Sequence, residues 1–509
     1  MRPRVLLLAL PVTWLACFSP TGSGVPSAEF DAGPGGAVFD ASTPDGEAPD
    51  AAAAEAGWVD ASKDVVLDVG PAPVTVVVGG ARGFEAGVPV VFADATGAPI
   101  FTGATSGAGI AAMIVPAGGM VTVLLGTPSQ PAPYTVMGLA SGDQVLVVDR
   151  GSLAALPPIL PLVAGAPLDA GVGDYEAFAG VCTSTSMYAS LPMNLAPGLH
   201  AGPCVGLGPI GNGFGAAYPV VVEAQNGSGG VLGYAFSRNN GITMPDEAGN
   251  LEVTLPPWST GTVAQTLALA DLPDATASAA VAYSEIADGI LTPLPQIPAP
   301  AGEAGLPPAQ LVHTHPGFAD AVQTELVVSP QPLYTPAGIA IVTAGAPPTT
   351  SGTVTLDASL AAAAPAFTAA AVTSPTAGQP VVGWTLAGGD LHAMTGVVAQ
   401  LGWSAITDGG AQNGVWTLVA PGTAASTLQA PALPSTLSGF APASGATFAA
   451  STLFAIDGRT AMPTYASMLP IGSLFVSQAG NCYVGLPAVP PLPRPGVAVV
   501  SIFSPGGGC

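Results

Sequence analysis

Short apolar runs rich in valine, isoleucine and threonine alternate with turn residues from residue 74 onwards. The run 74–78 is followed by two glycines, and the run 87–92 by Asp94-Ala-Thr-Gly97. Turn residues about every ten positions, with β-branched runs between them, are typical of a small β-sandwich. We therefore expect an all-β protein whose first folded domain spans residues 71–165.

The same alternation continues to the C-terminus and predicts two more β domains, a central one over 170–365 and a C-terminal one over 366–509. In the last range three apolar runs carry one tryptophan each, at Trp384, Trp403 and Trp416. This arrangement is similar to fibronectin type III modules, an analogy at the level of fold. The fold class we predict is several immunoglobulin-like or fibronectin-like β-sandwich domains.

Four short motifs in residues 71–165 resemble the carboxypeptidase regulatory-like family, whose domains are immunoglobulin-like β-sandwiches. They are Gly87-Val-Pro-Val90, Asp94-x-x-Gly97, Thr105-x-x-x-Gly109 and Pro116-x-Gly118. The family commonly has aspartate after the threonine, where this chain has Ser106. The resemblance implies turns rather than chemistry. Related surface domains can form Lys–Asn isopeptide bonds, which are excluded here because the only lysine, Lys63, lies outside the domain.

Composition narrows the possible partners. The 509 residues carry a formal charge of −24 and only eight lysines and arginines, so the chain repels phosphate backbones and we expect no nucleic-acid partner. Its 67 glycines and 55 prolines interrupt helices and suit turns. After residue 17 no run of about 18 apolar residues is free of helix breakers, so no membrane-spanning helix is expected.

The first residues have the layout of a secretory signal peptide. Two arginines precede an apolar stretch that ends in Trp14-Leu15-Ala16-Cys17, which resembles a bacterial lipobox, although Trp14 stands where leucine is usual. We expect residues 1–17 to be the lipoprotein signal peptide with its lipobox, and Cys17 to carry a lipid that anchors the chain to a membrane. The alternative is ordinary cleavage, for example after Ala28. Phe18 in place of aspartate favours the outer membrane, with the periplasmic or the outer face left open.

Residues 18–70 mix alanine, glycine, proline and acids with little periodicity. From Glu29 to Asp68 there are ten acidic residues and one base. Like charge and proline keep such a segment extended and solvated. We predict a disordered acidic linker between the lipid and the folded domains.

Five cysteines are present, and lipidation of Cys17 would leave four. Export implies an oxidising compartment, where four cysteines allow three disulfide pairings. Pairing of neighbours in the sequence, Cys182 with Cys204 and Cys482 with Cys509, is the economical choice. Zinc binding is the rival interpretation, but the chain has no C-x-x-C spacing.

The only constellation that suggests metal chemistry is His313-Thr-His315 with Asp320. Residues i and i+2 of a strand share a face, and imidazole suits zinc, copper or iron. The spacing is faintly similar to that of cupins, although glutamate is expected where Asp320 stands. A surface loop beside Pro316-Gly317 explains the same histidines without a metal. Short catalytic motifs for nucleotide, serine-hydrolase or zinc-protease chemistry are missing, so we expect no catalytic residue and no organic cofactor.

The function we predict is a non-enzymatic extracytoplasmic lipoprotein with a surface-binding, adhesive or envelope-structural role, whose ligand is a glycan or a protein. One alternative is a carbohydrate-binding protein that stacks sugars on exposed tryptophans. Against it, large aromatic side chains in sandwiches are more often part of the core. The other alternative is a His-x-His metal-dependent enzyme.

Overall fold

The computed structural model divides into two units, residues 1–67 and 68–509, and every described residue belongs to the second. The described residues are 71–80, 83–149, 159–164, 172, 174–179, 184–185, 217–225, 231–241, 251–271, 278–287, 290–293, 310–317, 321–329, 339–346, 353–376, 378–407, 410–423, 425–449, 452–473, 489, 492 and 494–503. The predicted signal peptide and acidic linker lie outside them.

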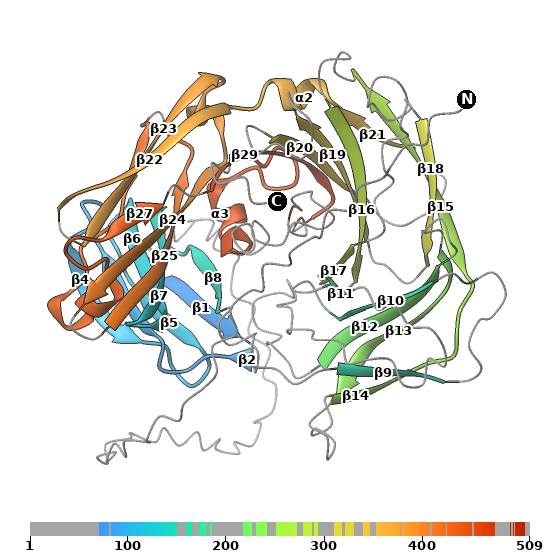
Figure 1. Cartoon of the computed structure of the whole chain (residues 1–509), viewed down its shortest axis with the longest axis horizontal. Helices are drawn as coiled ribbons and strands as arrows, with labels where there is room; N and C mark the ends of the chain where they lie inside the picture. Colours follow the sequence, from blue (N-terminus) through green and yellow to red (C-terminus); the bar gives the residue numbers. More distant parts are fainter. Residues whose placement is uncertain are drawn as a thin grey trace, which may run out of the picture. The chain divides into compact units, whose positions relative to one another are not determined.

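A 13-stranded sheet is the largest element of the described chain (Figure 1). Its order is β17-β16-β19-β20-β29-β28-β24-β25-β7-β6-β3-β4, with β27 paired to β24. The strands are β3 (Pro89–Ala93), β4 (Pro99–Ala104), β6 (Gly119–Thr127), β7 (Gln130–Leu139), β16 (Ser278–Ala287), β17 (Ile290–Pro293), β19 (Ala321–Ser329), β20 (Ile339–Ala346), β24 (Gly396–Thr407), β25 (Gly410–Pro421), β27 (Thr447–Ala449), β28 (Leu453–Asp457) and β29 (Gly496–Phe503).

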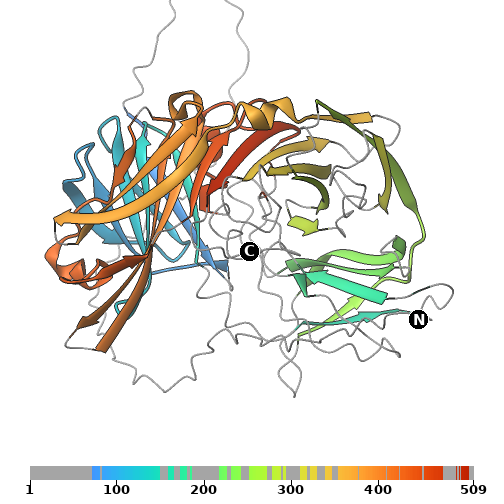
Figure 2. The same ribbon diagram turned by 45° about the horizontal axis from the view of Figure 1, so that its top comes forward.

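Two pairings connect parts of this sheet that are distant in sequence. β7 lies parallel to β25, with Val136 opposite Val419. β29, the red strand of Figure 2, pairs antiparallel with β20, with Val500 opposite Ile341. The sheet therefore takes strands from all three predicted domain ranges and links them by main-chain hydrogen bonds. The domain boundaries themselves stay a prediction.

One face of the large sheet shares a core with a second sheet. That sheet contains β1 (Val74–Gly80), β2 (Gly83–Phe84), β5 (Ile110–Met113) and β8 (Gln144–Val148), with β1 paired to the other three. Valines of β1 and β8 are buried in one cluster with Phe92, Val136, Val398 and Val500 of the large sheet. Sheets that pack through alternate inward residues form a β-sandwich, as the sequence pattern predicts.

The other face is covered in two places. The hairpin β22 (Ala366–Thr376) and β23 (Gln379–Gly388), with β26 (Thr427–Gln429), contributes Phe367 and Trp384 to a core that includes Trp403 and Trp416. The three-stranded sheet of β15 (Thr262–Ala270), β18 (Gln310–Pro316) and β21 (Thr353–Asp357) buries Leu267 with Leu326 of β19. The expected all-β fold class is confirmed.

Two smaller sheets and short helices complete the described chain. The sheets are β11-β10-β12-β13 and β14-β9, formed by β9 (Ile159–Val163), β10 (Asp174–Ala179), β11 (Ser184–Thr185), β12 (Ala217–Gln225), β13 (Val231–Gly241) and β14 (Leu251–Leu255). The helices are α2 (Ser359–Ala362), α3 (Tyr465–Met468) and the 3-10 turns η2 (Leu391–Ala393) and η3 (Ser435–Phe440). None of the helices among these residues is long and apolar enough to cross a membrane.

Two of the turn motifs of residues 71–165 form side-chain-capped turns in the structure. Asp94 Oδ1 accepts hydrogen bonds from the N–H groups of Thr96 and Ala98, and Gly97 has a positive φ of 83°. The hydrogen bond from the Thr96 hydroxyl is the main cause that lowers the pKa of Asp94. Ser106 accepts hydrogen bonds from the N–H groups of Ala108 and Ile110 at 3.3 Å in the same way. Ser106 thus serves in its turn as Asp94 does in the other.

Candidate functional site

Two polar side chains are buried on strand β19, the third strand from one edge of the large sheet. Gln323 is 0% exposed and Glu325 is 2% exposed. They stand two residues apart, so they point to the same face of the sheet, the face on which Val327 joins the core shared with β1 and β8. We call this pair the Gln323–Glu325 clamp.

The clamp holds residues that are more than 160 positions away in the sequence. Glu325 Oε1 accepts the N–H of Val489 at 3.2 Å, and Gln323 Oε1 accepts the N–H of Leu492 at 2.9 Å. Gln323 Nε2 donates to the Val489 carbonyl at 3.1 Å and to Glu325 Oε1 at 2.9 Å. Residues 490 and 491 are prolines and have no N–H. Both N–H groups of the stretch 489–492 are therefore bound by the clamp.

Apolar contacts surround these hydrogen bonds. Val489 is 1% and Leu492 7% exposed, and both belong to the core cluster shared by the large sheet and β1 and β8. Val489 and Leu492 are thus fastened to strand β19 by both hydrogen bonds and apolar contacts. We use the name strap for these two residues.

Burial dominates the electrostatics of the clamp. Desolvation raises the pKa of Glu325 from 4.5 to about 7, against the hydrogen bonds from Gln323 and Val489, which lower it. Among the described residues no charged group contributes to this pKa, and an ionised carboxylate in an apolar core is costly, so burial favours the neutral form. The cross-strand neighbour of Glu325 on β20 is Thr343, whose buried hydroxyl has no hydrogen-bond partner among the described residues.

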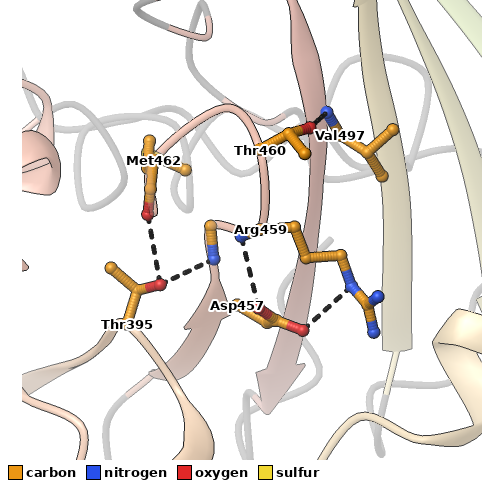
Figure 3. Close-up of polar contacts among 7 residues, drawn as sticks. Thr395, Asp457, Arg459, Thr460, Met462 and Val497 are labelled. Atoms are coloured by element: carbon orange, nitrogen blue, oxygen red, sulfur yellow. Dashed lines mark hydrogen bonds and ion pairs between the residues drawn. The ribbon is translucent and has the colours of Figure 1, made fainter. Parts of the chain in front are cut away.

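A second polar network lies where β28 ends and the chain turns towards α3 (Figure 3). Arg459 forms an ion pair with Asp457, Nε to Oδ2 at 2.9 Å. The Gly458 N–H donates to Thr395 Oγ1 at 2.8 Å, and this hydroxyl donates to the Met462 carbonyl at 3.3 Å. The turn at Asp457 and Gly458 leads into α3, and the next described strand, β29, begins only at Gly496.

The same network connects to β29 and β21. Thr460 Oγ1 accepts the Val497 N–H at 2.9 Å, and its carbonyl accepts Arg494 Nε at 2.9 Å. The pKa of Asp357, at the end of β21, is lowered mainly by its hydrogen bonds with Ser359 and also by the charge of Arg459. Partly exposed pairs of this kind contribute at most about 1 kcal/mol, so the network serves local structure.

The structure places the two histidines of the His-x-His motif in a strand rather than a loop. His313 and His315 lie in β18, opposite Gln265 and Val263 of β15. Their side chains, like the whole of Asp320, are outside the described residues. Gln265 is 6% exposed, and its Oε1 has no hydrogen-bond partner in the part of the chain that the structure describes. Among the side chains that are described, no group of three potential metal ligands occurs. Whether these residues bind a metal stays a prediction.

The five cysteines, Cys17, Cys182, Cys204, Cys482 and Cys509, also lie outside the described residues. Lipidation of Cys17 and the two disulfide pairings therefore stay predictions.

The tryptophans of the C-terminal range are in the core. Trp384 is 6%, Trp403 4% and Trp416 0% exposed. Trp416 Nε1 donates to Thr135 Oγ1 at 2.9 Å, and Trp403 Nε1 donates to Gln412 Oε1 at 3.2 Å. These three cannot stack on a sugar from solvent, so they give the carbohydrate-binding alternative no support and take the core positions that are usual for large aromatic side chains in sandwiches. Trp58 lies outside the described residues, and Trp258 is half-buried.

The clamp was missed in the sequence because its strand reads Ala-Val-Gln-Thr-Glu-Leu-Val-Val-Ser, with polar residues at 323, 324 and 325. Glutamine and glutamate at alternate positions predict a face open to water. One feature of the sequence could have indicated the clamp. The proline-rich stretch 487–495 has few N–H groups, and these need hydrogen-bond partners outside a β-ladder.

Comparisons with known proteins add little to this picture. No family model matches the chain, and no curated protein matches it. Among solved structures, the crystal structure of chicken CNTN1 FN1-FN3 domains matches at 8% identity, over 76% of this chain and 93% of that chain, with a TM-score of 0.10. So low a score carries no argument. The class of this protein therefore follows from its own strands and cores: it is an all-β protein of packed sheets.

Proposed function

We propose that this protein is a non-enzymatic lipoprotein of the bacterial envelope, a rigid β-body held at the outer membrane by a lipid on Cys17 and the acidic linker 18–70. Its role is structural or adhesive, with a protein or glycan as the binding partner. The lipobox-like Trp14-Leu15-Ala16-Cys17 and the apolar stretch before it support export and anchoring.

A non-enzymatic role is supported by the observation that buried polar side chains bind main-chain atoms of neighbouring segments. Gln323 and Glu325 bind main-chain atoms of the strap. Gln412 Nε2 donates to the carbonyl oxygens of Pro128, Gly439 and Ala441, at 3.3, 2.9 and 3.2 Å. Each of these groups fastens a loop to a sheet. Rigid sheets of this kind suit the presentation of loops to a partner.

Replacement of the anchoring thiol tests the proposal. The wild-type chain should fractionate with outer membranes and incorporate radiolabelled palmitate, whereas Cys17→Ser should lose the label and become soluble after lysis. Ser19→Ala is the matched control, because it changes a neighbouring residue and keeps the thiol. A Cys17→Ser chain that stays in the membrane fraction, or a wild-type chain without label, would overturn the proposal.

A metal site at His313 and His315 is a second candidate, favoured by one observation. The side-chain oxygen Oε1 of Gln265, which stands directly opposite His313 in the ladder, is buried and has no hydrogen-bond partner among the described residues. Residues directly opposite in an antiparallel pair share a face, and a metal ion held by both imidazoles would give that oxygen a partner. Metal analysis after dialysis against zinc decides the question. About one zinc per chain that is lost in His313→Ala supports the site, and no retained metal removes it.

A further inference from the structure

We propose that the edges of β20 and β28 that face β29 form a strand-acceptor site, and that the large sheet closes only when the segment 496–503 is inserted between them. The ligand of this site is an extended strand that is apolar on both faces, and the chain supplies it from its own sequence. The site exists whether or not the chain is lipidated.

β29 lies inside the large sheet, although it follows every other described strand in the sequence. It pairs antiparallel with β20 on one side and with β28 on the other. Among the described strands, no other pairing joins β17-β16-β19-β20 to the part of the sheet that runs from β28 to β4. Removal of β29 would therefore divide the sheet in two and leave an unpaired edge on each side of the division.

The side chains of β29 are buried on both faces of the sheet, without a break from residue 498 to residue 503. Val500 and Ile502 belong to the core shared with β1 and β8, Val499 to the cluster of Leu326, and Phe503 to the cluster of the buried tryptophans. One strand thus contributes to all three clusters. The acceptor site therefore requires a strand that carries apolar side chains on both faces, as central strands with two covered faces do.

Polar contacts fix the register of the inserted strand. Ser501, the one polar residue of the segment 497–503, is 3% exposed, and its hydroxyl donates to the Pro365 carbonyl at 2.5 Å. At the start of the strand, the Val497 N–H donates to Thr460 Oγ1 at 2.9 Å. A shift by one residue would turn the serine to the opposite face of the sheet, so the site selects one alignment of its ligand.

Each side of the acceptor site also has a core that other strands build. On the side of β20, Leu267 packs with Leu326, and on the side of β28, Leu401 packs with Trp416. β20 ends more than 140 positions before β29 begins, and pairing over such a separation carries a cost in loop closure. Because a chain is made from its N-terminal end, β29 becomes available after both of its partners, and its insertion completes the sheet.

Two truncations test the need for β29. A chain that ends at Pro495 lacks the strand, whereas a chain that ends at Phe503 keeps it. Both lack residues 504–509 with Cys509, so they differ in β29 alone. The chain that ends at Phe503 should keep the tryptophan emission and the cooperative urea transition of the full chain. The chain that ends at Pro495 should lose the transition and show the emission of solvated tryptophans.

Addition of the strand in trans tests the acceptor site itself. Residues 494–505, fused to the C-terminus of a soluble carrier protein, should bind the chain that ends at Pro495 and restore the emission of the full chain. Val500→Asp in the fused segment places a charge in the core and should weaken binding, measured by calorimetry, at least about 100-fold. Ser504→Asp is the matched control, because it adds the same charge beyond β29, and it should change the affinity less than about threefold.

Three results would overturn the proposal. A chain ending at Pro495 that matches the full chain in emission and urea transition would mean that the sheet closes without β29. A non-native chain of this length that does not bind the fused segment would mean that β29 is no separable ligand. Equal binding of the wild-type and Val500→Asp segments would place the contact outside the acceptor site.

Discussion

Replacement of Glu325 by glutamine should change the pH dependence of the stability of the whole protein. Burial raises the pKa of this carboxyl from 4.5 to about 7. At about 1.4 kcal/mol per pH unit, this difference corresponds to about 3 kcal/mol of folding free energy. Glutamine keeps an acceptor for the Val489 N–H and for Gln323 Nε2, so it removes the titration without removing the hydrogen bonds.

The sign follows from the direction of the shift. An acid whose pKa is raised in the folded state binds its proton more tightly there than in the unfolded chain. Glu325 therefore contributes most to stability below about pH 4.5. This contribution is lost as the pH rises to about 7, where the folded state must ionise it. Above about pH 7 the variant should be more stable than wild type by up to about 3 kcal/mol, and at about pH 4.5 the two should agree within about 1 kcal/mol.

Urea unfolding of both proteins at about pH 4.5 and about pH 8, followed by tryptophan fluorescence, measures this difference. The comparison is between the two proteins at each pH, because the 32 acidic residues titrate in both apart from the one replaced. A difference in free energy of unfolding that is the same at both pH values would refute the reasoning.

Three further substitutions test the account of the core. Trp416→Phe removes the hydrogen bond to Thr135 and leaves a cavity at a fully buried position, so thermal unfolding should show a loss of about 2–4 kcal/mol; a loss under about 0.5 kcal/mol would contradict the burial. Gln412→Leu leaves the three carbonyls that it binds without a partner and should cost about 2–4 kcal/mol by the same assay, whereas an unchanged Tm would show that water replaces it. Ile406→Ser, at a side chain that is 84% exposed, should change stability by less than about 0.5 kcal/mol, and a larger loss would mean that this residue is covered.

Much of the fold could be predicted from the sequence because it depends on local pattern. The run 144–148 is strand β8 and the run 251–255 is strand β14, with the boundaries that alternation and turn residues indicate. The turn at Asp94 formed as expected because aspartate, threonine and glycine satisfy a tight turn within five residues. Information of this kind lies within a few positions of the chain.

Pairing between distant strands could not be predicted in the same way. Nothing in the local sequence indicates that β7 lies parallel to β25, more than 270 residues later, or that β29 pairs with β20. Strand partners are chosen by the shape and burial of whole faces, which a single sequence does not show. The partner of β28 is likewise the distant β29 rather than a neighbouring strand.

The Gln323–Glu325 clamp could not be predicted from the sequence, for a separate physical reason. Glutamate at an alternate position of a strand predicts exposure, yet Glu325 is buried and accepts a hydrogen bond from Val489, more than 160 positions away in the sequence. The positions of the tryptophans, by contrast, could be predicted. Large aromatic side chains usually lie in sandwich cores, and Trp384, Trp403 and Trp416 are buried there.

The central claim, a β-body anchored through one cysteine, is tested most directly by intact mass spectrometry of the protein isolated from membranes of its native cell. The account predicts a chain that begins at Cys17 and carries the mass of a diacylglyceryl group on its sulfur, with or without an amide-linked acyl chain. A chain that begins at Met1, or one that begins after Cys17 without lipid, would contradict it.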